Sequence, residues 1–367
     1  MAIADVIDFI NSCETTWSRN TSPPWGIHEQ DPPPYNRLYG PVYPRGGVAG
    51  VLCHRDELIA QWGDIHRSDL TFSVAKTYLA LLAGLAVDDG LLPDVHEPVI
   101  ERCPGIGFEG ARNARITWHH LLQQTSEWDG TCLGIPDQVD RYRWVSHQPG
   151  KAEGTKGDPR PLGEPGSRFE YNDVRINQLS LALLHLFRRP LPDVFAERIL
   201  APTGCVDPFR WDGYEQGWEQ VGNERMLSVP GGSHWGGGVS ISAMDQAKIG
   251  LMLMRGGCRE SPTQGRTEGR TKSRTDGGSG GRVVLSRDWI ARMQQPCNVA
   301  PFYGYLVWLN QTGQVFPSAP RTSWFAIGAG SSVTWIDAER EIVCVLRWID
   351  SGKIDECVAR IMSAIDG

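Results

Sequence analysis

The stretch that decides the fold is Ser73-Val74-Ala75-Lys76-Thr77-Tyr78-Leu79-Ala80-Leu81-Leu82-Ala83-Gly84-Leu85-Ala86-Val87-Asp88-Asp89. It is almost continuously apolar after Lys76, and it is followed by Gly90, a residue type that often ends helices. A helix that is apolar on all sides has no face suited to water. The sequence therefore predicts that residues 73–89 form a helix buried at the centre of the molecule.

The start of this helix carries a candidate reactive pair, Ser73 and Lys76. Residues three apart share a helix face, so the lysine amine can lie beside the serine hydroxyl. A serine hydroxyl becomes a good nucleophile when a base takes its proton, and burial favours the neutral amine that could act as that base. Free N–H groups at a helix start can also stabilise an oxyanion. A purely structural alternative stays open, in which Ser73 caps the helix and Lys76 extends its charge to solvent.

Strand-like segments lie at both ends of the chain, with a block of helices between them. This order predicts an α+β fold, in which one mostly antiparallel sheet is assembled from both chain ends, flanked by helices, with an inserted, mainly helical subdomain. We expect 1–90 and 236–367 to form the sheet domain, 91–235 the subdomain, and the low-complexity segment 256–282 a flexible loop. The expected strands are 47–53, 57–62, 303–309, 323–327, 332–337 and 341–348, and the expected helices include 2–12, 116–124, 173–188, 195–200, 242–255, 286–294 and 353–364.

The composition narrows the class of protein. The 367 residues include 36 Lys plus Arg and 43 Asp plus Glu, a net charge of −7, which argues against a nucleic-acid partner. There is no apolar run long enough to span a membrane, and the first residues do not resemble a secretory signal. The nine cysteines are spread singly, as in a reduced protein. We therefore expect a cytoplasmic protein without a membrane partner; the oligomeric state is left undetermined.

A second motif follows about a hundred residues after the first. It reads Phe169-Glu170-Tyr171-Asn172-Asp173 and is preceded by Pro165-Gly166. The chain resembles the serine β-lactamase and penicillin-binding-protein superfamily, whose members carry S-x-x-K on the central helix and Y-x-N about a hundred residues later, often after a P-G-x-x-F-x-Y lead-in. Ser73, Lys76, Pro165, Gly166, Phe169 and Tyr171 match this pattern in order and spacing. The segments 116–126 and 236–242 are similar to that family's "HTS" loop and its glycine-rich entry to a later helix. The resemblance covers roughly 46–366 and implies a β-lactamase-like fold.

The resemblance implies a role for each matching residue. Ser73 would be the acylated nucleophile, Lys76 its proton acceptor or electrostatic partner, and Tyr171 the group that shuttles the proton to the leaving group. The oxyanion would be held by the N–H of the serine and by a second donor from the edge strand, which should come from Phe325-Ala326-Ile327-Gly328-Ala329-Gly330. Which residue donates stays open, and Ile327 and Gly328 are the candidates for substrate binding there. Tyr171 as an ordinary core aromatic stays open as an alternative.

Two departures from the family pattern matter. Asp173 stands where the family has Asn, and its carboxylate can either hold Lys76 charged or cap the following helix. The third box, K-T-G or H-T-G, is missing: no Lys or His lies between 298 and 352, and Arg321 is a doubtful substitute. Without that cation and without an export signal, the chain looks more like the esterase and amidase branch, which includes family VIII carboxylesterases and 6-aminohexanoate-dimer hydrolase.

Other candidate sites are weaker. Gly277-Gly278-Ser279-Gly280-Gly281 fits G-x-S-x-G, but it lies in the low-complexity loop with no strand before it. The histidines show no paired metal-ligand spacing, so we expect no metal and no organic cofactor. Trp128 and Trp235 lie in loops expected to border the cleft; they either line an apolar acyl pocket or are simply partly buried.

These features predict a serine hydrolase that cleaves small carboxylic esters or amides through an acyl-enzyme on Ser73. Three alternatives stay open: an acyltransferase that uses the same acyl-enzyme, an activity like that of β-lactamases or D,D-peptidases, and a non-catalytic binding module on the same scaffold.

Overall fold

One antiparallel sheet is built from both ends of the chain. The computed structural model describes residues 1–22, 28–259 and 282–367, and in this part of the chain the largest sheet has the order β10-β11-β12-β13-β1-β2. The N-terminal hairpin joins the C-terminal strands where β1 pairs with β13, with Val51 opposite Val345. The strands are β1 (Ala49–His54), β2 (Glu57–Trp62), β10 (Trp308–Leu309), β11 (Trp324–Gly328), β12 (Ser332–Asp337) and β13 (Ile342–Arg347).

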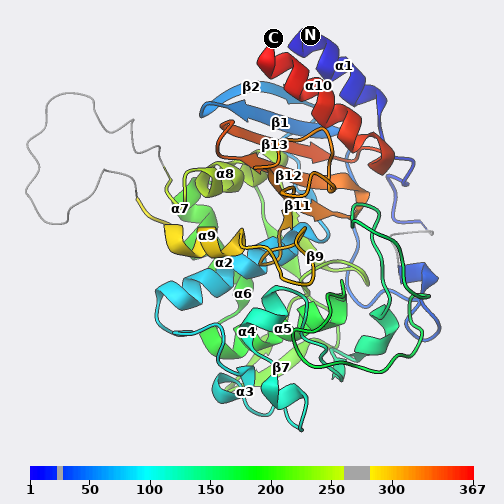
Figure 1. Ribbon diagram of the computed structural model, residues 1–367, viewed down its shortest axis with the longest axis vertical. Helices are drawn as coiled ribbons and strands as arrows, with labels where there is room; N and C mark the ends of the chain where they lie inside the picture. Colours follow the sequence, from blue (N-terminus) through cyan, green and yellow to red (C-terminus); the bar gives the residue numbers. More distant parts are fainter. Residues whose placement is uncertain (23–27, 260–281) are drawn as a thin grey trace, which may run out of the picture.

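Helices cover both faces of this sheet (Figure 1). Every residue of β13 is buried, as expected for a central strand with two covered faces. Val343 and Val345 pack with Ala243 and Ala247 of α8 (Ala243–Met254). Helices α1 (Ile3–Ser12) and α10 (Ile354–Asp366) lie side by side over the sheet, which also brings the two termini together (Figure 1).

Helix α2 (Val74–Asp88) lies at the centre of the molecule, and every residue from Val74 to Ala86 is buried. The central buried helix predicted for 73–89 is therefore confirmed. Trp289 of α9 (Arg287–Met293) packs so closely over Gly84 that a Cβ there would lie 2.3 Å from the indole ring. Helix α5 (Asp173–Phe187) packs beside α2 and ends ahead of Pro190.

Between α2 and β9 the chain forms short helices, short strands and long connections. A second sheet, β3-β9-β6, joins this region to the strand before α2. The proposed division at residues 90 and 235 stays a prediction. The elements of this region are α3 (Val99–Arg102), α4 (Trp118–Leu122), β4 (Thr131–Cys132), β5 (Ile135–Pro136), α6 (Leu191–Phe195), α7 (Ala201–Thr203), β6 (Arg210–Asp212), β7 (Trp218–Val221), β8 (Glu224–Leu227) and β9 (Gly238–Ile241), with the 3₁₀ turns η2 (Asn113–Arg115) and η3 (Asp137–Asp140) and the π-helical turn η4 (Ala196–Leu200). Strand β3 (Asp69–Leu70) and the 3₁₀ turn η1 (His28–Gln30) precede α2, and the 3₁₀ turns η5 (Ala329–Ser331) and η6 (Ser351–Lys353) follow β9.

Two expected elements differ in extent. The strand expected over 303–309 forms only at Trp308–Leu309, because the chain turns before it with Leu306 at φ 54°. The helix expected over 195–200 continues α6 as the π-helical turn η4. Most of the predicted loop 256–282, with Gly277–Gly281, lies outside the described residues. None of the described helices is both long and apolar enough to cross a bilayer.

Candidate active site

Ser73 and Lys76 form a buried hydrogen-bonded pair at the start of α2. Lys76 Nζ donates to Ser73 Oγ at 2.7 Å, and the lysine side chain is 1% exposed. The serine hydroxyl makes no capping bond to the helix. The purely structural alternative is therefore wrong, because the Ser73 hydroxyl does not cap the helix and the Lys76 ammonium does not reach solvent. Phe72, immediately before the serine, has φ 50°, an uncommon backbone conformation for a bulky residue.

Asp173 pairs with Lys76 instead of capping α5. The cap is Asn172, whose side chain accepts from the N–H groups of Val174 and Arg175. Asp173 Oδ1 lies 2.6 Å from Lys76 Nζ. Of the two roles left open for Asp173, the structure supports the ion pair.

Tyr171 lies against this pair. Its ring centroid is 4.7 Å from Lys76 Nζ, and the side chain is 2% exposed. The ring packs on Trp308 and Tyr303, with centroids 5.4 and 6.4 Å away. The structure therefore brings together the hydroxyl, the amine and the phenol that the sequence places almost a hundred residues apart.

Arg143 is a charged residue of the site that the sequence reasoning missed. Its Nη1 lies 2.9 Å from both Asp140 Oδ2 and Asp173 Oδ2, and its Cζ lies 5.2 Å from the centroid of the Tyr171 ring. Burial alone would raise the pKa of Asp173, but Arg143 and Lys76 outweigh it and hold that pKa well below its usual range. The long connection that carries Arg143 has no helical or strand periodicity that could have identified it.

Behind Arg143 the ion pairs continue as a cluster. His234 Nε2 lies 2.9 Å from Asp31 Oδ2, and Lys156 forms ion pairs with Asp31 and Asp140. We call Asp31, Lys76, Asp140, Arg143, Lys156, Asp173 and His234 the cavity cluster. It holds three cations and three carboxylates. Burial lowers the pKa of His234, although Asp140 opposes the shift, so the cluster is close to neutral overall.

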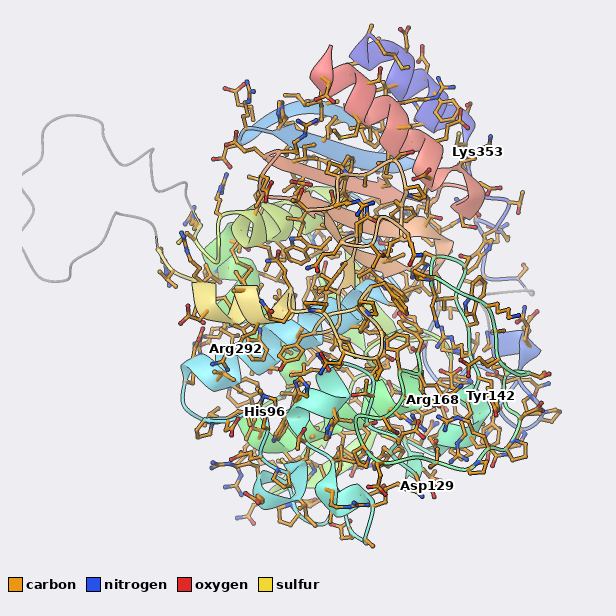
Figure 2. All side chains as sticks on the ribbon, in the orientation of Figure 1. His96, Asp129, Tyr142, Arg168, Arg292 and Lys353 are labelled. Atoms are coloured by element: carbon orange, nitrogen blue, oxygen red, sulfur yellow. The ribbon has the colours of Figure 1, made fainter. Side chains whose placement is uncertain are left out.

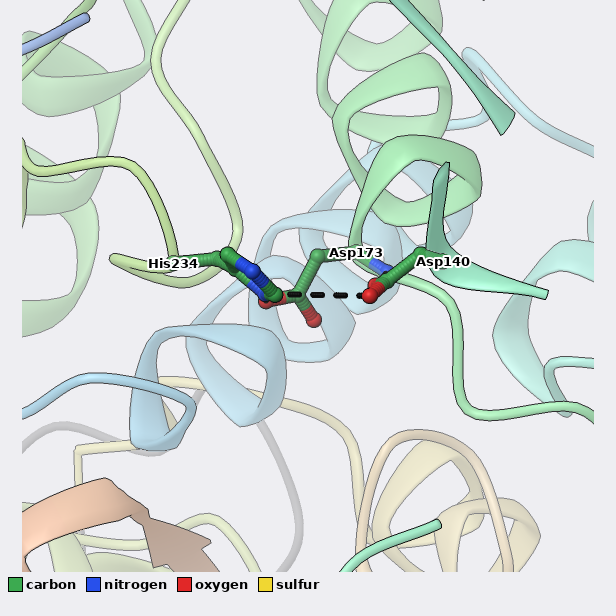
Figure 3. Close-up of side chains that lie close together, drawn as sticks. All are labelled: Asp140, Asp173 and His234. Atoms are coloured by element: carbon green, nitrogen blue, oxygen red, sulfur yellow. Dashed lines mark hydrogen bonds and ion pairs between the residues drawn. The ribbon is translucent and has the colours of Figure 1, made fainter. Parts of the chain in front are cut away.

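Asp140, Asp173 and His234 have the donor types of a metal site. One ligand atom from each lies within 4.8 Å of the others, and Figure 3 shows the three side chains converging. Each carboxylate already has Arg143 Nη1 2.9 Å away, and Asp173 also has Lys76. A metal ion would have to displace these cations, so this donor set does not fit one.

A cavity of about 530 Å³ opens beside Ser73 and Tyr171. Strand β11 ends on its wall, close to the serine: a Cβ at Gly328 would lie 2.0 Å from Thr71 O and 3.0 Å from Ser73 N. Ile327 and Gly328 both line the cavity, as their predicted role requires. Part of the wall comes from the two ends of the chain, namely Thr15, Trp17, Gln30, Ile349, Ser351, Gly352, Ile354 and Asp355.

The expectation that Trp128 and Trp235 line an acyl pocket is wrong, because neither is on the cavity wall. Both are buried with their indole N–H groups satisfied: Trp128 donates to Gly107 O at 2.7 Å, and Trp235 donates to Asp31 Oδ2 at 2.9 Å. The tryptophans on the wall are Trp17 and Trp144. Arg321 is exposed and lies off the cavity, so it does not replace the missing third-box cation.

Several solved structures share the fold of this chain. A proposed 6-aminohexanoate-dimer hydrolase from Bacillus anthracis has a similar structure, with a TM-score of 0.60 at 12% identity over 96% of this chain and 87% of that one. EstCE1, a hydrolase with promiscuous acyltransferase activity, gives 0.57 at 16% identity over 90% and 94%. A beta-lactamase from Mycobacterium bovis gives 0.53 at 16% over 87% and 92%.

At these identities the structural similarity establishes a shared fold. None of the curated proteins compared with this chain matches it in sequence. The sequence profile of the beta-lactamase family matches residues 46–348, which include Ser73, Lys76 and Tyr171. The chain therefore belongs to the beta-lactamase family.

Proposed function

We propose that this protein is a serine hydrolase that cleaves small carboxylic esters or amides through an acyl-enzyme on Ser73. The observation that carries the proposal is that Ser73 Oγ, hydrogen-bonded to Lys76, lies on the wall of a cavity of about 530 Å³ that Tyr171 also lines. This volume lies in the range of small-molecule sites. The partner is thus a small ester or amide, and neither a nucleic acid nor a membrane is part of the proposal.

The ion pair with Asp173 assigns Lys76 the role of electrostatic partner. In the proposed reaction, Ser73 Oγ attacks the carbonyl carbon as its proton passes to the Tyr171 phenolate, which Lys76 stabilises. The phenol then protonates the departing alcohol or amine, leaving an ester bond on Ser73. Water attacks this ester, releases the carboxylic acid and returns the proton to Ser73, so that each bond broken is matched by one formed.

The test compares the wild type with Ser73→Ala on p-nitrophenyl acetate and butyrate. Removing the nucleophile is expected to reduce turnover by at least about 10⁴-fold. Ser146→Ala, which removes another serine of the cavity wall, is the matched control and should retain activity. A fluorophosphonate adduct should map to Ser73. Full activity in Ser73→Ala, or an adduct elsewhere, would refute the proposal.

A panel of esters, amides and β-lactams, followed by mass spectrometry of the intact protein, separates the remaining alternatives. An adduct formed by β-lactams alone would favour a β-lactamase-like or D,D-peptidase-like activity. Transfer to an added alcohol or amine, read from the products, would favour an acyltransferase. A wild-type protein that resists every acylating reagent would be a binding module.

A further inference from the structure

Arg143 places a positive charge on the cavity wall of a chain that lacks the cation of the family's third box. Residues 325–330, where that box would stand, read Phe-Ala-Ile-Gly-Ala-Gly and carry no charge. The described cavity wall nevertheless has a buried cation, Arg143, which comes from the connection after η3. Its guanidinium lies 5.2 Å from the centroid of the Tyr171 ring.

The charges around Tyr171 explain why a second cation is needed there. Lys76 favours the phenolate, but Asp173 at 2.6 Å largely cancels the lysine charge. Asn, the family residue at position 173, would not do so. Without Arg143, the cavity cluster would hold three carboxylates but only two cations, Lys76 and Lys156, which leaves a net negative charge beside the phenol. In a buried site such an imbalance opposes the phenolate strongly.

We infer that Arg143 is a positioning residue: it offsets the charge of Asp173 and keeps the Tyr171 phenolate accessible to proton transfer. The inference rests on the proposed function, since it assigns Tyr171 the proton. It extends that function because the cation that favours the Tyr171 phenolate comes from the connection after η3, which contains none of the family's motifs.

Several other charged or titratable groups face Arg143 and Tyr171. Each variant described below keeps all of them except the residue that it replaces. Burial, reinforced by Arg143 and Lys76, lowers the pKa of His147 to about 3, so this ring is uncharged at neutral pH. Burial raises the pKa of Tyr303 well above its usual range. Among the described residues these groups include Lys76 of α2, Asp173 of α5, Asp140 at the end of η3, His147, Lys156 and His234 around Arg143, Tyr214 near Asp173, and Tyr303 beside Trp308.

The experiment measures kcat/KM for a p-nitrophenyl ester, and the rate of fluorophosphonate labelling, as functions of pH. In Arg143→Gln the acidic limb of both profiles should move up by about one pH unit, because loss of a nearby cation disfavours the phenolate. Arg143→Lys should restore most of the shift. The control is Arg168→Gln, which removes an arginine lying over the ring of Tyr142 at 5.5 Å, away from the cavity (Figure 2).

Removing a buried arginine also leaves a carboxylate uncompensated, which can lower the yield of folded protein. The double variant Arg143→Gln with Asp173→Asn removes both charges and restores the family's Y-x-N box. It should recover most of the activity lost on the acidic limb in Arg143→Gln. An equal loss at every pH, with no rescue by lysine and no recovery in the double variant, would reduce Arg143 to a structural role and overturn the inference.

The inference and the proposed function can fail separately. If the wild type is not labelled at Ser73, the proposed function fails, but the phenol can still be titrated by its ultraviolet absorbance as the difference between the wild type and Tyr171→Phe. Arg143→Gln should then raise the midpoint of that difference titration relative to the same difference in the Arg143 background. An unchanged midpoint would overturn the inference even in an active enzyme.

Discussion

Two buried clusters of ion pairs lie on opposite sides of the start of helix α5. The cavity cluster contains Asp173, and a second cluster contains Arg175, only two residues further along the helix. Arg175 lies 3.2 Å from both Glu127 Oε1 and Asp137 Oδ2, and Arg160 lies 2.8 Å from Glu170. We call this second set the structural cluster; its members are Glu127, Asp137, Arg141, Arg160, Glu170 and Arg175.

The two clusters are alike in burial and in charge balance, but they differ in what they touch. No residue of the structural cluster lines the cavity that contains Ser73. This cluster also holds a perturbed carboxylate: burial opposes the shift, but hydrogen bonds from Arg160 and the charge of Arg175 lower the pKa of Glu127 to about 2. A shifted pKa is thus no sign of a site by itself; the adjoining hydroxyl, phenol and cavity make the difference.

The largest effect is expected from breaking the cavity cluster at its centre. Tyr171→Phe should lower kcat/KM by about 10²- to 10⁴-fold, the usual contribution of a positioned proton-transfer group, and Lys76→Met should do the same because it removes the charge that stabilises the phenolate. Because the two act as one unit, the double variant should be little worse than the poorer single one. Losses that multiply would mean that the lysine and the phenol work independently.

Breaking the structural cluster should instead affect the fold. Glu127→Gln is expected to lower the free energy of unfolding by about 3–5 kcal/mol at pH 7, since it leaves buried arginines uncompensated, while kcat per folded molecule changes little. The matched control is Glu153→Gln, which removes an exposed partner of Arg168 and should cost at most about 1 kcal/mol. A large loss of kcat in folded Glu127→Gln would show that the clusters are coupled.

The stability of the structural cluster should depend on pH through Glu127, and the direction follows from its lowered pKa. The folded pKa of Glu127 lies below its ordinary value of 4.5, so its stabilising contribution is present above that pH and is lost as the pH falls toward 2. Urea titrations of the wild type should therefore show falling stability across this window. Glu127→Gln should flatten that fall, and a curve parallel to that of the wild type would contradict the assignment.

The smallest effect is expected at the cavity wall contributed by the N-terminal segment. Trp17 lines the cavity and packs edge-on against Phe72, with centroids 5.6 Å apart. Trp17→Ala should raise KM for the butyrate ester by about tenfold through lost apolar contact, with a smaller change in kcat. Trp218→Ala, at an exposed strand away from the cavity, is the control. An equal rise in KM in Trp17→Ala and Trp218→Ala would show that Trp17 does not contact the substrate.

The sequence predicted those features of the fold and the site that depend on local sequence patterns. The apolar run after Lys76 identified the buried helix, and the motif around Tyr171 identified a phenol that the structure places beside it. It could not predict Arg143 or exclude Trp128 and Trp235, because side-chain direction in long connections is set by tertiary contacts and leaves no periodic signal. The role of Asp173 was likewise ambiguous until Asn172 was seen to supply the cap.

The family profile stops short of both ends of the chain, yet both ends border the cavity beside Ser73. The reactive groups and part of the surface that would meet a substrate are therefore encoded in separate stretches of the gene. Changes in the terminal stretches can retune the choice of substrate without disturbing the chemistry, and a recombinant fragment trimmed to residues 46–348 would keep the reactive groups but lose a side of their enclosure.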